Sequence, residues 1–338
     1  MDRIRLGIVG CGYWGPNLIR NFEENPNAQV VIVSDLKKER LTQIKNTYPD
    51  VLTTQNYSDL FLQNLDAVVI ATPPPTHFAI ASDCIKHGLH VMVEKPLTLD
   101  SKTSQELVDI AAEHNRVLMV GHTFQYHGAI LALKNLIDSG ELGEIYYLDT
   151  ARLNLGLYSR ELNVLWDLAP HDISILFYLL GSKPTSVSAH GTSCVIEGIH
   201  DVAYVNLAFP NNIMAHVHVS WLDPAKVRRV TVVGSKKMAV LNDISTTEKI
   251  KIYDKGVTQP ENTDSYGEFL ISYHSGDVLI PNVRMAEPLK VECQHFLDCI
   301  TTGGNPCSGG VDGLNVVKVL EAAHKSLVNS GHVEVMQW

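Results

Sequence analysis

One lysine stands where its amine could assist chemistry at a substrate oxygen. Lys95 lies in Glu94-Lys95-Pro96, directly after the apolar run 91–93, so its amine is expected to emerge at the carboxyl end of a buried strand. Pro96 keeps the backbone of Lys95 out of the helical region. A compact ammonium there can donate a hydrogen bond to a substrate hydroxyl and stabilise the negative charge that develops on its oxygen. The alternative is a surface lysine that pairs with Glu94.

A histidine and a carboxylate form a second candidate pair. Asp167 and His171 are four residues apart and lead into the apolar run 173–180. If a helix includes both, they share one face, and if it begins near Pro170 they can still meet across the turn. A histidine beside a carboxylate can remove a proton from an alcohol near neutral pH. The alternatives are a helix-end histidine bonded to its own cap, and an Asp172 that favours the helix start electrostatically.

A glycine-rich turn follows the apolar run 4–9. It has the spacing G-x-G-x-x-G, with Gly10, Gly12 and Gly15, and it leads into a helix-like segment that begins with Pro16. Gly10 permits a sharp turn out of a strand, Gly12 removes the side chain that would block a pyrophosphate, and Gly15 lets the helix pack closely on the sheet. The helix N-terminus adds N–H donors and a partial positive charge. The turn predicts dinucleotide binding, and the alternative is a strand-to-helix turn that binds no ligand.

An acidic residue supports the dinucleotide interpretation. Asp35 ends the apolar run 29–34, about twenty residues after the last glycine, where such units place a carboxylate on the adenosine ribose. A carboxylate accepts hydrogen bonds from the ribose hydroxyls and repels a 2′-phosphate, which favours NAD over NADP. Lys37 and Lys38 could soften that repulsion. Asp35 could also cap a helix over 37–48, and both roles can coexist.

The elements that must position these residues follow a regular order in the first 120 residues. Strand-like and helix-like segments alternate, as a parallel sheet covered by helices requires. Strands are expected over 4–9, 30–34, 67–71, 91–94 and 117–120, and helices from 16, from 37, over 78–87 and over 101–114. In such sheets ligands bind at the carboxyl ends of the strands, where three polar segments lie: 72–77, 94–96 and 121–125.

The pattern changes after a helix expected over 129–139. Strands are expected over 143–152, 186–192, 202–209, 213–221, 227–234, 237–241 and 249–253, with a helix over 172–180 between the first two. Apolar and polar residues alternate over 215–220, which predicts a mostly antiparallel sheet with one covered face and one open face. The open face is a candidate subunit contact. Helical periodicity over 287–301 and 313–330 predicts two helices that fold back onto one of the sheets.

Two domains follow from this order. An α/β N-terminal Rossmann domain with a parallel sheet is expected over 1–121. An α+β C-terminal domain with a large open, mostly antiparallel sheet is expected over 122–338, for substrate binding and oligomerisation. A length of 338 residues suits two domains of ordinary size.

Composition excludes several classes of protein. An apolar content of 45% and a charged content of 19% are typical of a soluble globular chain. The formal net charge of −10, without an arginine-rich run, argues against nucleic-acid binding. The six cysteines show no C-x-x-C spacing, which favours reduced thiols in the cytoplasm. No signal peptide and no membrane-spanning run is expected.

Metal chemistry and covalent hydrolysis find little support in the sequence. His216 and His218 point to one face of a strand, but a third ligand is not evident. The sequence has no H-E-x-x-H motif and no cysteine cluster, so no metal site is expected. It also lacks a G-x-S-x-G nucleophile elbow, which argues against covalent hydrolysis.

The motifs together resemble the glucose–fructose oxidoreductase/inositol dehydrogenase (Gfo/Idh/MocA) family over most of the chain. They are the glycine turn, segment 71–74, Glu94-Lys95-Pro96 and Asp167-x-x-x-His171. The resemblance implies that Lys95 and His171 are the catalytic pair, with Asp167 beside them. Besides the three glycines, it places along the cofactor Tyr13, Trp14, Asp35, Thr72, Pro73, His77, Glu94, Lys95 and Gln125. It also implies a homodimer or homotetramer, because the family often uses its open sheet for subunit contacts.

Segments 12–17, 163–172 and 272–277 look like family members that act on nucleotide-linked amino sugars such as UDP-N-acetylglucosamine. This resemblance implies NAD-dependent oxidation of a ring hydroxyl, at C3, which converts the sugar to a ketosugar. It also implies that the substrate contacts Lys95, Asp167 and His171. Four further residues are substrate candidates, because two of them are cations that could meet a diphosphate: Arg152, Asn154, Tyr158 and Arg160. Solvated surface arginines are the alternative.

Two other functions stay open at this point. One is an NADPH-dependent ketosugar reductase, because hydride transfer is reversible. The other is a non-catalytic nucleotide-binding regulator of the same fold. In every case the expected ligands are small molecules, without a nucleic-acid or membrane partner.

Overall fold

The computed structural model describes residues 3–156, 158, 162–258 and 272–338. The chain packs as two compact units, one formed by Met1–Tyr126 with Ala286–Lys318 and the other by His127–Met285 with Val319–Trp338. The division therefore falls within α8 (Gly310–Val328). It differs from the expected boundary after residue 121, and it assigns segment 286–318 to the first unit. None of the helices in the described ranges is long and apolar enough to cross a bilayer.

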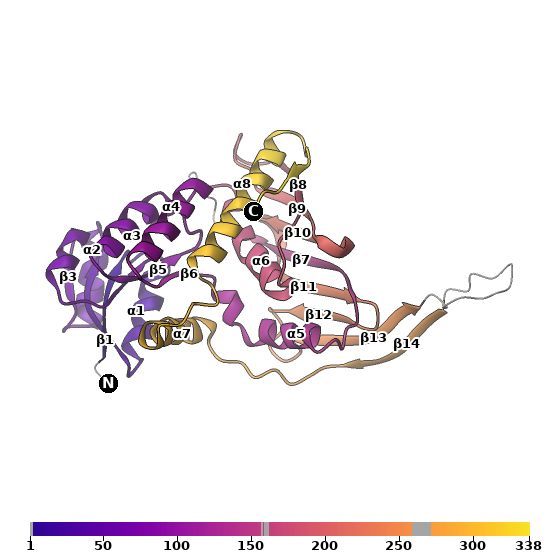
Figure 1. Ribbon diagram of the computed structural model, residues 1–338, viewed down its shortest axis with the longest axis horizontal. Coiled ribbons are helices and arrows are strands. Elements are labelled where there is room, and N and C mark those ends of the chain that lie inside the picture. The colour runs from indigo at the N-terminus through magenta and orange to yellow at the C-terminus, as the bar shows by residue number, and fades with distance from the viewer. Residues whose placement is uncertain (1–2, 157, 159–161, 259–271) are drawn as a thin grey trace. The chain divides into compact units, whose positions relative to one another are not determined.

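The first unit contains a six-stranded parallel sheet with the strand order β3-β2-β1-β4-β5-β6. Its strands are β1 (Ile4–Val9), β2 (Ala28–Ser34), β3 (Leu52–Thr54), β4 (Ala67–Ile70), β5 (His90–Glu94) and β6 (Leu118–Gly121). Its helices include α1 (Gly15–Glu23), α2 (Lys38–Thr47), α3 (His77–Lys86) and α4 (Ser101–Glu113), with 3₁₀ turns η1 (Tyr57–Leu62), η2 (Pro74–Thr76) and η3 (Thr123–Tyr126) (Figure 1). The predicted Rossmann domain is confirmed. Edge strand β3 was not predicted, because three residues carry no readable pattern.

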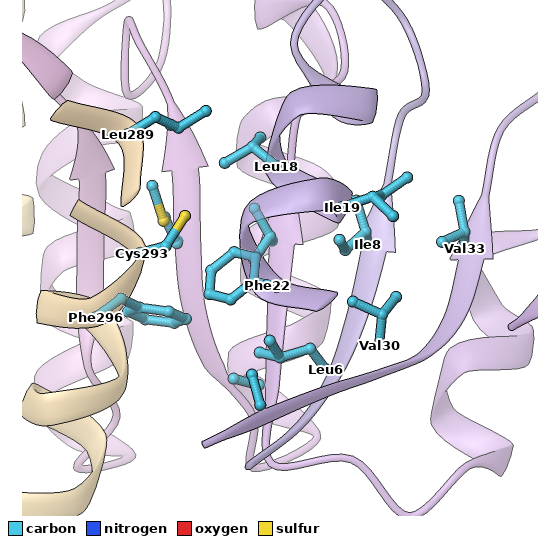
Figure 2. Packing of buried hydrophobic residues seen from close by; sticks show 14 of the residues in the cluster. Leu6, Ile8, Leu18, Ile19, Phe22, Val30, Val33, Leu289, Cys293 and Phe296 are labelled. Carbon is cyan, nitrogen blue, oxygen red and sulfur yellow. The ribbon is translucent and has the colours of Figure 1, made fainter. Parts of the chain in front are cut away.

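Helix α7 (Pro288–Thr302) belongs to this unit because it packs on α1. Figure 2 shows Leu289, Cys293 and Phe296 of α7 on the side that faces Phe22 of α1, and all four side chains join one buried cluster with β1 and β2. The spacing of the three α7 residues is that of one helical face. Burial of each large apolar side chain stabilises the unit by about 1.5–3 kcal/mol. The sequence predicted the helix but not the sheet on which it packs.

The second unit contains a nine-stranded sheet with the order β14-β13-β12-β11-β7-β10-β9-β8-β15. Its strands are β7 (Ile145–Leu155), β8 (Ser186–Thr192), β9 (Val202–Ala208), β10 (Met214–Ser220), β11 (Leu222–Gly234), β12 (Met238–Asn242), β13 (Ile250–Thr258), β14 (Ser272–Leu279) and β15 (Glu334–Val335). Strands β7 and β10 pair in parallel and the other neighbours are antiparallel, which confirms the predicted mostly antiparallel sheet. Strand β14 was missed because residues 273–279 are exposed and show no burial pattern.

Helices α5 (Gly128–Asp138) and α6 (Val164–Leu180) pack against this sheet (Figure 1). Ala215, Val217 and Val219 of β10 are at most 1% exposed. His216 and His218 alternate with them and point to the other face, where the ring of Tyr204 lies 4.3 Å from that of His218. The predicted alternation of a covered face and an open face is therefore present in β10. A 3₁₀ turn, η4 (Pro210–Asn212), joins β9 to β10.

Helix α6 begins eight residues earlier than the sequence pattern predicted. Asn163 caps it, because its Oδ1 accepts a hydrogen bond from the N–H of Trp166 at 3.2 Å. Pro170 lies inside the helix and not at its start, although it has no N–H for the intrahelical ladder. Of the two alternatives that the sequence left open, the structure has the one in which the helix includes both Asp167 and His171.

Candidate functional site

The glycine turn after β1 is shaped by two close backbone contacts and one open position. Gly10 has a φ of 99°, and a Cβ there would lie 2.5 Å from the carbonyl oxygen of Ala71. A Cβ on Gly15 would overlap the carbonyl oxygen of Gly10. At Gly12, in contrast, the nearest atom is Nη1 of Arg40 at 3.7 Å. The protein's own packing requires the first two glycines, whereas a Cβ at Gly12 would only make an ordinary contact with the Arg40 guanidinium.

Asp35 ties the end of β2 to this turn. Its Oδ2 accepts a hydrogen bond from the N–H of Cys11 at 2.6 Å and pairs with Nη1 of Arg40 at 3.2 Å. Its Oδ1 accepts from the N–H of Lys37 at 2.8 Å, and it does not cap α2, whose N-cap is Lys37. The carboxylate thus lies beside the glycine turn, where an adenosine ribose is held in dinucleotide folds. Arg40 was missed, although a cation five residues after the acid is visible in the sequence.

Two aromatic side chains flank the turn. Tyr13 is 82% exposed and Trp14 is 38% exposed, and their rings meet edge to face with centroids 5.6 Å apart. Large exposed rings next to an open cradle offer apolar contact area to a ligand. Thr72 lies after β4, where its hydroxyl oxygen accepts a hydrogen bond from the hydroxyl of Thr76 at 2.7 Å, and Pro73 precedes the turn η2.

His77 holds two loops of the site together. It is fully buried, and its ring nitrogens lie 2.8 Å from the carbonyl oxygen of Thr72 and 2.9 Å from that of Pro96. Burial lowers the pKa of His77, while the two carbonyl oxygens oppose that shift. Because the ring faces the protein's own backbone, we interpret His77 as a residue that positions the loops after β4 and β5, and not as a direct cofactor contact.

Lys95 follows β5 at the same edge of the sheet as the glycine turn, since β1, β4 and β5 are neighbouring parallel strands. Its side chain is partly buried and the Lys95–Pro96 peptide bond is cis. The carboxyl group of Glu94 accepts a hydrogen bond from the N–H of Lys95 at 3.3 Å. Burial raises the pKa of Glu94 to about 7, against the opposing charge of Lys95. Glu94 is therefore divided between its charged and neutral forms near neutral pH.

Two buried residues lie near this position: Glu292, which the sequence did not single out, and His122, which belongs to the predicted ligand-binding segment 121–125. Glu292 of α7 is fully buried and its Oε2 accepts a hydrogen bond from the hydroxyl of Thr123 at 2.6 Å. Burial, and then the neighbouring Glu94, raise the pKa of Glu292 well above its usual range. Burial and the charge of Lys95 lower the pKa of His122 to about 3. For Glu292, the signal in the sequence was a glutamate on the apolar face of a predicted helix.

Gln125, the last cofactor candidate of the first unit, lies in η3 and is 5% exposed. The backbone N–H of Gln125 donates to the backbone carbonyl oxygen of His122 at 2.9 Å. Segment 121–125 therefore follows β6 at the same sheet edge as Lys95, as the sequence predicted for a ligand-binding edge.

The Asp167 and His171 pair belongs to the second unit. Both residues lie within α6, so their spacing of four places them on one face of a continuous helix. Oδ2 of Asp167 accepts a hydrogen bond from the indole Nε1 of Trp221 at 3.0 Å. Trp221 was not predicted, because it lies far from Asp167 in the sequence and on a different element.

The four further substrate candidates have different surroundings. Arg152 of β7 forms a buried bidentate pair with Asp172 of α6, with distances of 2.7 Å from Nε to Oδ2 and 3.3 Å from Nη2 to Oδ1. This bond occupies its guanidinium and disfavours a diphosphate role. Asn154 is partly buried at the end of β7, and the ring of Tyr158 lies 5.4 Å from that of Trp221. Arg160 lies outside the described residues.

The two alternating histidines of β10 have protein partners. Nδ1 of His216 lies 2.9 Å from Oδ1 of Asn206, and the ring of His218 stacks on Tyr204. Over the ranges that the structure describes, no three His, Cys, Asp or Glu side chains are grouped in a way that could hold a metal ion.

Comparison with known proteins matches both units to one family. Residues 4–122 match the Gfo/Idh/MocA oxidoreductase family with an NAD-binding Rossmann fold, and residues 130–240 match the Gfo/Idh/MocA C-terminal domain.

Curated relatives and solved structures cover most of the chain. The chain is 28% identical over 267 residues to UDP-N-acetylglucosamine 3-dehydrogenase of Acidithiobacillus ferrooxidans, covering 76% of this chain and 79% of that protein. The structure of that enzyme, GnnA, has a TM-score of 0.79 at 25% identity and covers 97% of this chain and 98% of its own. The chain is also 27% identical to scyllo-inositol 2-dehydrogenase (NAD(+)) of Bacillus subtilis, over 98% and 96% of the two chains.

A further solved structure shows the likeness of the fold. GenD2 from gentamicin A biosynthesis, in complex with NAD, has a TM-score of 0.84 at 21% identity and covers 100% of this chain and 97% of its own.

The raised pKa of Glu94 predicts a pH-dependent stability. The carboxyl group of Glu94 loses its proton near pH 4.5 in the unfolded chain and near pH 7 in the folded protein. Its contribution to the free energy of unfolding is therefore fully present below pH 4.5 and is lost as the pH rises through about 7. Between pH 5.5 and 8 the stability of the wild type should fall by about 2 kcal/mol relative to Glu94→Gln. Urea unfolding at both pH values measures it. The exposed Glu113→Gln is the control, and a difference that does not change with pH would contradict the assignment.

The Arg152 pair predicts a structural and not a ligand-binding role. Arg152→Ala leaves Asp172 charged and buried without this partner, and should destabilise the protein by about 3–5 kcal/mol. Arg229→Ala on the adjacent strand β11 is the control, because its pair with Asp149 is exposed and should contribute less than about 1 kcal/mol. The two variants are compared by urea unfolding. An Arg152→Ala protein as stable as the control, with weakened sugar binding, would restore the diphosphate role.

Proposed function

Because the chain belongs to the Gfo/Idh/MocA family of oxidoreductases, we propose that it catalyses the reversible, NAD-dependent oxidation of a ring hydroxyl of a nucleotide-linked amino sugar. The proposed substrate is UDP-N-acetylglucosamine, oxidised at C3 to a ketosugar. The observation that carries the proposal is the position of Lys95 at the carboxyl end of β5, on the sheet edge that also bears the glycine turn.

The first unit provides the residues that hold the cofactor. Gly12 leaves room for the pyrophosphate, Asp35 accepts hydrogen bonds from the adenosine ribose, and Tyr13 and Trp14 cover the dinucleotide. Bound NAD supplies the hydride acceptor. The carboxylate of Asp35 favours NAD over NADP, because a 2′-phosphate would meet a negative charge there.

Lys95 binds the hydroxyl that is oxidised. Its ammonium donates a hydrogen bond to the substrate oxygen and stabilises the negative charge that develops as the carbon loses hydride. The neighbouring groups favour this task, because burial lowers the pKa of His122 to about 3 and raises the pKa of Glu292 above its usual range, which favours the neutral form of each. The ammonium lies in a partly buried position, where its electrostatic effect is stronger than in water.

His171 removes the hydroxyl proton. A neutral imidazole accepts the proton from the substrate oxygen, and the carboxylate of Asp167, one helical turn earlier, stabilises the imidazolium that forms. In the reverse direction His171 returns the proton to the ketosugar oxygen. The proposal requires Lys95 and His171 to reach the same hydroxyl.

The substrate class is supported by similarity. The relative from A. ferrooxidans acts on UDP-N-acetylglucosamine, whereas the one from B. subtilis acts on scyllo-inositol. Both names describe oxidation of a ring hydroxyl, and segment 163–172 resembles members that act on nucleotide-linked amino sugars.

We further propose that the protein assembles as a dimer or tetramer through the open face of the second unit's sheet. Tyr204 and Met214, on neighbouring strands, are 42% and 55% exposed. Exposed apolar side chains of this size are typical of protein contacts.

Replacement of either proposed catalytic residue should abolish turnover without loss of the cofactor. Lys95→Ala and His171→Ala should each lower kcat at least about 100-fold, because each removes a charge or proton transfer needed in the transition state. The affinity for NAD should change by less than about threefold. Purified protein is incubated with NAD and a panel of UDP- and dTDP-linked sugars, and both reduced cofactor and product mass are measured.

The controls are Lys102→Ala and His332→Ala, which replace exposed residues of the same types. They should retain wild-type turnover. Near-normal turnover in both Lys95→Ala and His171→Ala would refute the proposed roles.

A further inference from the structure

Trp221 occupies the junction between β10 and β11 and is 1% exposed. It is the largest fully buried side chain in the described part of the chain. Its indole N–H does not point into apolar surroundings but donates to Oδ2 of Asp167 at 3.0 Å. A buried tryptophan usually needs such a partner, and here the partner is the carboxylate next to the proposed base.

The backbone of Trp221 is fixed at both of its polar groups. Its N–H donates to the carbonyl oxygen of Asp201 at 2.9 Å, and its carbonyl oxygen accepts from the N–H of Gly156 at 2.8 Å. These bonds join the loop before β9 and the end of β7 to the β10–β11 junction. The start of the tryptophan side chain is therefore held by two other segments of the unit.

The indole ring is also fixed by packing. A Cβ on Gly156 would lie 2.7 Å from Cδ1 of Trp221, so the ring fills space that only glycine leaves free. The ring of Tyr158 packs at a centroid distance of 5.4 Å. The position of the indole ring is thus restricted by the surrounding chain as well as by its hydrogen bond to Asp167.

This geometry sets the orientation of the Asp167 carboxylate. A hydrogen bond to Oδ2 restricts rotation about the Cβ–Cγ bond, and it therefore fixes the direction of Oδ1 as well. Asp167 precedes His171 by one helical turn, and Asp172, directly after His171, is held to β7 by Arg152. The residues on both sides of the proposed base are bonded to the sheet.

We propose that Trp221 is a positioning residue, which holds the Asp167 carboxylate in the orientation that supports proton removal by His171. This inference rests on the proposed function. The inference goes beyond the proposed function because it assigns a role to the indole N–H of Trp221, in addition to the apolar area of its ring. The two contributions can be separated, because phenylalanine keeps most of the ring and lacks the donor.

A double-mutant cycle tests the inference. We expect Trp221→Phe to lower kcat for the sugar about tenfold or more, with the KM for NAD unchanged within about twofold. In the Asp167→Ala background the same substitution should change kcat by less than about twofold, because the group that it positions is absent. An equal loss in both backgrounds would show a packing role only and would overturn the inference, as would an unchanged kcat.

The matched control is Trp338→Phe. Trp338 also belongs to the second unit, and its indole N–H donates to the carbonyl oxygen of Pro184 at 2.9 Å. Its replacement by phenylalanine therefore also removes an indole hydrogen bond. Its kcat should stay within about twofold of wild type. If Trp221→Phe fails to fold, the ¹⁵N-indole spectrum of the wild type and of Asp167→Asn replaces the cycle: one strongly shifted indole resonance should move in the variant, and an unchanged spectrum would overturn the inference.

The outcomes also separate the inference from the proposed function. If the wild-type protein turns over the sugar and the Trp221→Phe variant is equally active, only the inference about Trp221 is overturned. If the wild-type protein produces neither ketosugar nor reduced cofactor from any sugar, both the inference and the proposed function are overturned.

Discussion

The turn after β1 passes so close to the end of β4 that no side chain fits at Gly10. A Cβ on Gly10 would lie 2.5 Å from the carbonyl oxygen of Ala71 after β4, and the carboxylate of Asp35 after β2 accepts a hydrogen bond from the N–H of Cys11. This close approach requires glycine at position 10, whereas a Cβ at Gly12 would meet no backbone atom within 4 Å. The rest of the proposed cofactor site depends on it, because the same edge carries the loop after β5.

Buried charge is controlled differently in the two units. At the carboxyl edge of β5, burial favours the neutral forms of Glu292 and His122, and it raises the pKa of Glu94, beside Lys95, to about 7. In the second unit, Asp172 remains buried opposite Arg152, which fixes α6 to β7. The first arrangement suits stabilisation of a developing negative charge, and the second suits a rigid helix that presents a base.

Much of the fold could be predicted from the sequence, because apolar periodicity is a local property. Strand β1 and the Asp167–His171 spacing were evident in this way, and the family resemblance followed from short motifs. Contacts between distant segments could not be predicted. The Arg152–Asp172 pair, the Trp221–Asp167 bond and the packing of α7 on α1 each join residues whose sequence neighbours give no signal. The start of α6 stayed open in the sequence, because proline favours the first turn of a helix, whereas here the cap is Asn163 and Pro170 lies inside.

In the proposed reaction, hydride passes from a ring carbon of a sugar to nicotinamide. The most direct measurement uses UDP-N-acetylglucosamine that carries deuterium at C3, incubated with the protein and NAD for a single turnover. Mass spectrometry of the extracted cofactor then reports where the label went, even where bound cofactor is recycled and absorbance does not change. If hydride is transferred directly from C3, the reduced cofactor carries one deuterium. Unlabelled cofactor, with the deuterium retained by the sugar or released to water, would contradict it.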